Sequence, residues 1–282
     1  GGTAPTRMNV HVPSFSVEGL FPWDILDGEG LRIGMVTVRS PQVELNRSEP
    51  DTARSERSEA DTSLVRLPRV PDADSVVRDL FTNIVPRNVQ PLSIGGIEIV
   101  DGTLLTNGAD SASTYAGTIR GIDLQIGTIS VDATNAHVRP IAHVDLRVRE
   151  WQRRHNDGRL IATHGLHLRI DDRDSAMSVD SIGYHVANGY RFDASGVRFS
   201  YRTRELSITR FAIAPSGTDE AFFARHRYNV DRFRISGGPV VLRNMDFSAL
   251  EDRTAFHVGV IDVDALDLDL LSNRRLRPDS ST

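Results

Sequence analysis

Large apolar residues recur along this chain in a fixed arrangement: two that alternate with polar residues, a skip of two residues, then two more. The arrangement is clearest in Leu31-x-Ile33-x-x-Val36-x-Val38 and in Leu92-x-Ile94-x-x-Ile97-x-Ile99. Alternation at a period of two predicts a strand with one apolar face. The skip reverses the alternation, as a β-bulge does, and predicts a bend in the strand. Further copies run from Leu124 to Val131, Met177 to Tyr184, Leu206 to Ile213, Tyr228 to Ile235 and Phe256 to Val263.

The order of elements around these copies also repeats. After the first copy come Pro41, a polar stretch, a helical stretch, a second copy and the pair Gly95-Gly96. After the copy that begins at Leu206 come Pro215, a polar stretch, another copy and the pair Gly237-Gly238. Divergent internal repetition indicates a stacked architecture that extends in one direction. An ordinary β-sandwich built from amphipathic strands is the alternative that this pattern leaves open.

The pattern predicts a mainly β protein: one elongated, curved, largely antiparallel sheet that forms an open apolar groove, with one or two short helices. We expect residues 1–282 to form a single elongated module, and that module to be a fragment of a longer protein. Residues 48–70 are almost all polar and are expected to form a mobile loop. An apolar stripe at helical spacing predicts a helix over 72–85 that packs on the sheet or caps it, and a shorter helix is expected over 219–226.

Composition narrows the function classes. The chain has no cysteine, so disulfides and thiolate chemistry are excluded. The net charge is −5, and acidic and basic residues alternate along the strands, so no basic face for nucleic acid is expected. No apolar run reaches the length of a membrane-spanning helix. The chain opens on Gly1-Gly2 rather than Met, and we expect a signal or membrane anchor to have been removed from its N-terminus.

The residues that carry chemistry in other proteins form no recognisable site here. His164 and His167 are three apart on a predicted strand, so they are expected on opposite faces, where they cannot share a metal ion. The chain has no GxSxG, phosphate-loop or HExxH motif. We therefore predict no catalytic residues, no cofactor and no metal site. The series Asp262, Asp264, Asp267 and Asp269 alternates with apolar residues and predicts a solvated strand face.

Two segments carry a resemblance to a known family. Leu31–Leu45 follows the spacing φxφxxφxφxxPxφxφ, where φ is a large apolar residue, and Leu92–Leu104 follows φxφxxφxφxxGxφ. Both resemble strands of AsmA-like proteins, a bacterial envelope family related to TamB. The resemblance implies a U-shaped β-groove with an apolar interior, held in the periplasm by an N-terminal inner-membrane anchor that this sequence does not contain. It also implies movement of phospholipids between the inner and outer membranes, or envelope homeostasis, without catalytic residues.

The leading hypothesis is therefore a non-enzymatic periplasmic protein that binds or conducts phospholipid acyl chains, with envelope proteins as further partners and no nucleic acid. An alternative is a structural module that docks partner proteins by strand addition at its sheet edges. A carbohydrate-active enzyme is a third alternative, although Trp23 and Trp151 do not form a series. The predicted lining residues of the groove are Ile94, Ile97, Ile99, Leu124, Ile126, Ile129, Val179, Ile208, Phe211, Phe233, Val258 and Ile261.

Overall fold

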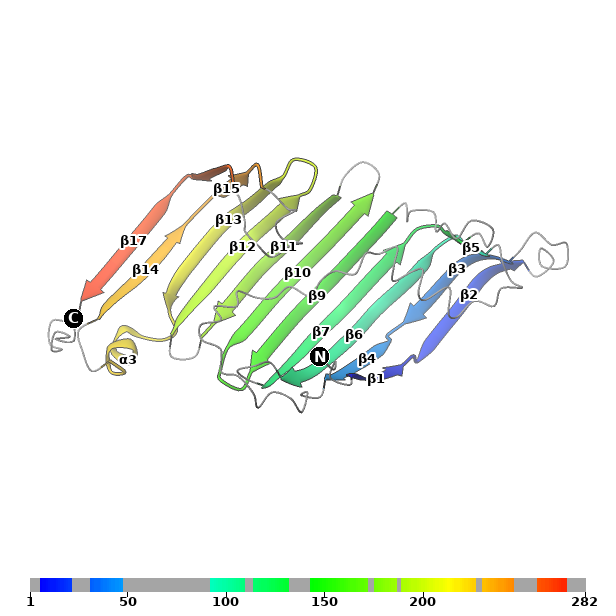
Figure 1. Cartoon of the computed structure of the whole chain (residues 1–282), viewed down its shortest axis with the longest axis horizontal. Helices are drawn as coiled ribbons and strands as arrows, with labels where there is room; N and C mark the ends of the chain where they lie inside the picture. The colour runs from blue at the N-terminus through cyan, green and yellow to red at the C-terminus, as the bar shows by residue number, and fades with distance from the viewer. Residues whose placement is uncertain are drawn as a thin grey trace, which may run out of the picture.

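The described part of the chain is one large β-sheet. The computed structural model describes residues 6–21, 31–47, 92–109, 114–131, 143–171, 175–186, 189–226, 230–245 and 258–272. Within them, seventeen strands join one sheet, and the only α-helix is α3 (Asp219–Phe223). Figure 1 shows the strands side by side in a single layer, with α3 at one end. This confirms the predicted mainly β, curved, open sheet. The predicted loop 48–70 and helix 72–85 lie outside the described residues.

The strands are bounded as follows. They are β1 (Thr6–His11), β2 (Ser14–Phe21), β3 (Leu31–Arg39), β4 (Gln42–Arg47), β5 (Leu92–Ile94), β6 (Ile97–Ala109), β7 (Thr114–Ile126), β8 (Ile129–Val131), β9 (His143–His155), β10 (Leu160–Asp171), β11 (Ser175–His185), β12 (Tyr190–Ser200), β13 (Glu205–Pro215), β14 (Asp231–Gly237), β15 (Val240–Arg243), β16 (Val260–Val263) and β17 (Leu266–Ser272).

These seventeen strands fill eleven side-by-side positions, which we call lanes. Six lanes hold two consecutive strands end to end, namely β1 with β2, β3 with β4, β5 with β6, β7 with β8, β14 with β15, and β16 with β17. The other five hold one strand each, from β9 to β13. Neighbouring lanes are antiparallel except where β3 and β4 pair with β5 and β6. The first lane (β1 and β2) and the last (β16 and β17) form the two edges of the described sheet.

Every lane has an irregular position at the same level of the sheet, where the alternation of side chains between the two faces is interrupted. Paired residues lie on either side of this position along the strand. We call these positions the kink line. In three lanes the interruption is a left-handed glycine: Gly121, Gly165 and Gly196 have φ between +61° and +64°. A Cβ on Gly165 would collide with the side chain of Asp180 in the next lane, and one on Gly196 with Thr209. Two reasons therefore require glycine at these positions: the left-handed backbone conformation and the lack of space for a Cβ atom.

The kinks leave both halves of a strand with the same apolar face. Val179 and Ile182 lie on either side of the kink in β11, and both belong to one packed cluster. Ile94 and Ile97 pack together in the same way across a further break, between β5 and β6. The two-residue skip in the sequence is thus the bend that keeps large apolar side chains together.

Two of the seven sequence copies do not form such a bent strand. In the copy that begins at Tyr228 only the second apolar pair lies in a strand, because β14 starts at Asp231. The copy that begins at Phe256 likewise enters the sheet only at Val260, where β16 starts. The first residue of each copy lies outside the described residues.

The helix α3 lies inside the predicted range 219–226. Thr218 caps it, because its side-chain oxygen accepts a hydrogen bond of 3.2 Å from the Ala221 N–H. Phe222 and Phe223 are buried, and Phe222 packs edge-on against Tyr190 with ring centroids 5.7 Å apart. The helix therefore closes one end of the sheet beside β12.

Candidate functional site

A row of apolar side chains crosses the whole described sheet. Its members face one another pairwise from the first lane to the last, one residue per lane, and none is polar. We call it the Val38 row: Phe15, Val38, Ile99, Leu124, Leu146, Leu168, Met177, Phe199, Leu206, Leu242 and Ile261. Directly paired residues point to the same side of a sheet, so these residues share a face.

A second row crosses the same face beyond the kink line, and only a threonine and a glycine interrupt its apolar character. We call it the Val43 row: Val10, Val43, Leu104, Ile119, Trp151, Thr163, Ile182, Ala194, Phe211, Gly237 and Leu266. The side of the sheet that carries both rows is the apolar face.

The apolar face is packed only within its own layer. Buried residues form two small clusters, one around Ile94 and Ile129 and one around Val179, Ala194 and Val197. Most other apolar side chains in the interior lanes are only half-buried. No second layer of described residues packs over this face, because α3 is the only described helix and it lies at one end (Figure 1). A sheet with one apolar face needs a covering layer to remove that face from water.

The sequence-predicted lining residues collect on this face with one exception. Ile99, Leu124 and Ile261 belong to the Val38 row, and Phe211 belongs to the Val43 row. Val258 precedes β16 and belongs to no paired row. The remaining seven follow the same face by strand alternation and packing: Ile94, Ile97, Ile126, Ile129, Val179, Ile208 and Phe233. Their role as the lining of a lipid groove stays a prediction.

Several residues of the same face are absent from the predicted lining set. Leu146, Leu168 and Met177 continue the Val38 row through the centre of the sheet. Alternation along β9 and β10 could have identified the first two. Trp151, weighed from the sequence only as a sugar-binding residue, pairs with Ile119 in the Val43 row. It lies in the C-terminal half of β9.

The opposite face carries most of the charged residues, many of them paired. His167 Nε2 lies 3.1 Å from Asp145 Oδ2, and Arg147 Nε lies 3.2 Å from Asp145 Oδ1. Burial acts to raise the pKa of Asp145, but the hydrogen bond from His167 and the neighbouring positive charges outweigh it, so the pKa lies below its ordinary value. His185 and Arg191 form a similar pair of contacts with Asp193, at 3.3 and 3.4 Å. We call this side the polar face.

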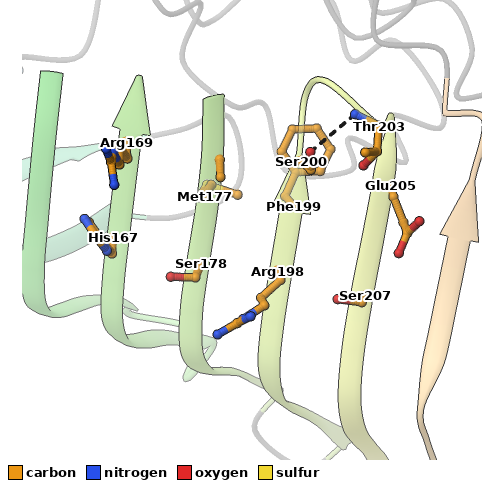
Figure 2. A pocket seen from close by; sticks show the side chains of 11 residues that line it. His167, Arg169, Met177, Ser178, Arg198, Phe199, Ser200, Thr203, Glu205 and Ser207 are labelled. Atoms are coloured by element: carbon orange, nitrogen blue, oxygen red, sulfur yellow. Dashed lines mark hydrogen bonds between the residues drawn. The ribbon is translucent and has the colours of Figure 1, made fainter. Parts of the chain in front are cut away.

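A depression of about 390 Å³ lies over β10 to β13, mainly on the polar face, and Figure 2 shows the side chains that line it. Arg198, Ser178 and Ser207 line it, together with His167 and Arg169. Both of the latter are engaged: His167 with Asp145, and Arg169 with Asp171 at 2.9 Å. The depression is open and its lining mixes polar with apolar side chains, and it presents no deep apolar pocket of the kind that holds a small-molecule substrate.

The expectation for His164 and His167 was wrong. Their paired partners, Ser181 and Ser178, place both histidines on the polar face. The left-handed Gly165 between them reverses the alternation, so residues three apart point the same way. Even so, the described residues include no group of three or more His, Cys, Asp or Glu side chains that could hold a metal ion.

A buried arginine ties α3 to the last lane. Arg232 in β14 exposes 3% of its side chain, and it contacts Asp219 at 3.0 Å and Asp269 at 2.6 Å. Asp219 also bonds Arg234 at 2.8 Å. The hydrogen bond from Arg232 lowers the pKa of Asp269 below its ordinary value, against a smaller opposing effect of desolvation.

Comparison with other proteins returns no relative. The chain matches no protein-family profile, no curated protein and no solved structure. Among the described residues, no helix is long and apolar enough to cross a membrane.

Proposed function

We propose that this chain is a non-enzymatic protein of the bacterial envelope that binds phospholipid acyl chains on its apolar face. The observation that carries the proposal is the Val38 row, which stays apolar through all eleven lanes while the opposite face carries most of the charged residues. The resemblance of Leu31–Leu45 and Leu92–Leu104 to AsmA-like strands supports a periplasmic site of action between the inner and outer membranes.

The physical chemistry of the face suits such a ligand. Each methylene that an acyl chain buries contributes roughly 0.8 kcal/mol, so a long chain needs contact area rather than polar recognition. Ten spacings of about 4.8 Å between eleven lanes give the apolar face a length of about 48 Å across the strands. Charged head groups would remain in water at the margin of the sheet.

The test is lipid binding by the purified chain. Native mass spectrometry and solvent extraction should find phospholipid bound, and the protein should speed transfer of a fluorescent phospholipid between vesicles of phosphatidylethanolamine and phosphatidylglycerol. The double variant Leu146→Asp, Leu168→Asp should reduce bound lipid about tenfold, because it places two charges in an apolar row. A lipid-free protein that also fails to transfer the labelled phospholipid would refute the proposal.

The matched control lies on the other face of the same region. Ser178→Asp with Ser207→Asp adds the same two charges to the polar face and should leave bound lipid unchanged. Circular dichroism of both double variants checks that each keeps the β-sheet.

A second candidate function is docking of a partner protein at the sheet edges, and one observation favours it. The most exposed large apolar residues lie in the two edge lanes rather than in the interior of the described sheet. Edge strands with free backbone groups can add a strand from another chain.

A further inference from the structure

The two edge lanes expose apolar side chains that belong to the same face of the sheet. In interior lanes the corresponding residues are mostly buried or half-buried by neighbours on both sides. At the edges the exposed fractions are 62% for Met8, 54% for Val10, 63% for Phe15, 63% for Ile261, 61% for Leu266 and 58% for Leu268. Among the described residues, each edge therefore lacks the second neighbour that every interior lane has.

The apolar rows connect the two edges level by level. The Val38 row begins at Phe15 and ends at Ile261, and the Val43 row begins at Val10 and ends at Leu266. A third row of paired residues, interrupted by Thr106, Gly117 and Arg153, begins at Met8 and ends at Leu268. Rows follow the direction of the inter-strand hydrogen bonds, so a strand added beside the last lane continues all three.

One register joins the last lane to the first lane of another copy. The first lane runs from the Met8 level to the Phe15 level, and the last lane runs the opposite way, from Ile261 to Leu268. The pairing is therefore antiparallel. The antiparallel register that sets Leu268 opposite Met8 also sets Ile261 opposite Phe15, seven residues further along each strand. Both halves of the bent lane are therefore in register at the same time.

The charges on the polar face favour this register. With Leu268 opposite Met8, Asp269 lies opposite Arg7 and Asp267 lies opposite Asn9. Pairing of β17 with β17 of another copy would instead bring the aspartates of both strands together, and like charges directly opposite are destabilising. The charge pattern thus selects the contact between unlike edges.

From the matching rows, the single register and these charges, we propose that a second copy of this chain docks by strand addition, with its β1 and β2 edge against the β16 and β17 edge of the first. The contact is heterologous, so each added copy presents a free edge of the same kind and assembly is open-ended. The apolar face continues from one copy to the next. This inference does not rest on lipid binding, because it uses only the edges.

Sedimentation velocity over a range of protein concentrations tests the proposal, with three variants. The wild-type chain should show species that grow with concentration. Arg7→Glu should weaken self-association about tenfold, because the introduced carboxylate meets Asp269 and its diagonal neighbour Asp267. Asp267→Arg should weaken it similarly, through repulsion with Arg7. The double variant Arg7→Glu, Asp267→Arg should recover part of the loss, since the two exchanged charges again attract each other across the contact.

The recovery is specific because Arg7 and Asp267 lie in opposite edge lanes of one chain, about ten spacings of about 4.8 Å apart. Coupling between them can arise only between copies. Arg120→Glu reverses a charge on the polar face of an interior lane and should leave self-association unchanged.

Hydrogen exchange of the wild-type chain gives a second readout that needs no variant. Amide protection in β1 and β17 should rise with protein concentration, while protection in β10 and β11 should not. A chain that stays monomeric at all concentrations, or a double variant no better than the two single variants, would overturn the proposal.

Discussion

At the scale of single residues, one guanidinium holds three elements together. Arg232 belongs to β14, Asp219 to α3 and Asp269 to β17, and both carboxylates bond the same buried side chain. An arginine that is almost fully removed from water depends on such partners, because an unpaired buried charge is costly. The helix and the edge strand are thus fixed to the sheet by the same group.

Removal of Asp219 should therefore destabilise the protein. We expect Asp219→Ala to lower the free energy of unfolding by about 1.5–3 kcal/mol, the range for hydrogen bonds to charged groups. Urea denaturation followed by circular dichroism measures it. Glu220→Ala, on the exposed side of the same helical turn, is the matched control and should change stability far less; equal losses would contradict the assigned role of Asp219.

The polar-face carboxylates also predict a dependence of stability on pH. The pKa of Asp145 is lowered in the folded protein, so the folded state binds fewer protons than the unfolded state in mild acid. The stabilisation is present above the unfolded pKa of about 4 and is lost as the pH falls through the folded value.

Urea midpoints between about pH 6 and about pH 2.5 span this range and measure the effect. The urea midpoint of the wild-type protein should fall in acid. The midpoint of Asp145→Asn should be lower near neutral pH and should fall less steeply in acid. Asp264→Asn, which removes an exposed carboxylate between β16 and β17, is the control substitution and should leave the urea midpoint near neutral pH unchanged. A profile identical for Asp145→Asn and wild type would count against the Asp145 contacts.

At the scale of elements, the kink line explains why bent strands keep one apolar face. Gly165 and Gly196 take left-handed conformations at matching points of β10 and β12, and the side chain of the next lane fills the space beside each. A non-glycine residue in this conformation costs roughly 1–3 kcal/mol, before any collision is counted.

Gly165→Ala and Gly196→Ala should each lower the free energy of unfolding by at least about 1–3 kcal/mol. Gly183→Ala in β11 is the matched control, because Gly183 has no left-handed φ and an added Cβ would make only ordinary contacts. Thermal or urea unfolding compares the three. A Gly183 variant as unstable as the other two would show that the loss does not depend on the left-handed conformation at the kinks.

The sequence was sufficient to predict the strands and their apolar face, because period-two alternation survives wherever a strand is half-buried. Leu92-x-Ile94 and Leu206-x-Ile208 are examples. It was insufficient at the kinks: alternation placed His164 and His167 on opposite faces, and only the conformation of Gly165 shows otherwise. The last residues of β9 also lack an apolar pattern, because Arg153 lies over the Tyr115 ring at 3.7 Å in a cation–π contact that alternation does not predict.

The residues of the apolar face were predictable from the sequence to the same extent as the strands. Alternation identified residues of the apolar face such as Ile97 and Leu124, but it could not say that they align across lanes, because pairing register is a property of the folded sheet. The carboxylates of β17 are exposed, as their alternation predicts. Their position at the edge that matches the first lane becomes visible only when the rows are traced across the sheet.

At the scale of the whole molecule, the described chain is one layer with two chemically different faces. The Val38 row and the Val43 row make one face apolar from edge to edge, and the ion pairs around Asp145 and Asp193 occupy the other. The proposed lipid binding and the proposed edge-to-edge association would use separate parts of this layer, the face and the edges, so each can be tested while the other is left intact.

Two adjacent positions of β9 allow phospholipid contact with the two faces of the sheet to be compared directly. A photoreactive benzoyl-phenylalanine in place of Leu146 points from the apolar face, and the same group in place of Arg147 points from the polar face. After irradiation with vesicles of phosphatidylethanolamine and phosphatidylglycerol, mass spectrometry counts phospholipid adducts. Our account predicts adducts at position 146 and almost none at position 147. Equal labelling at both positions, or labelling at neither, would contradict it.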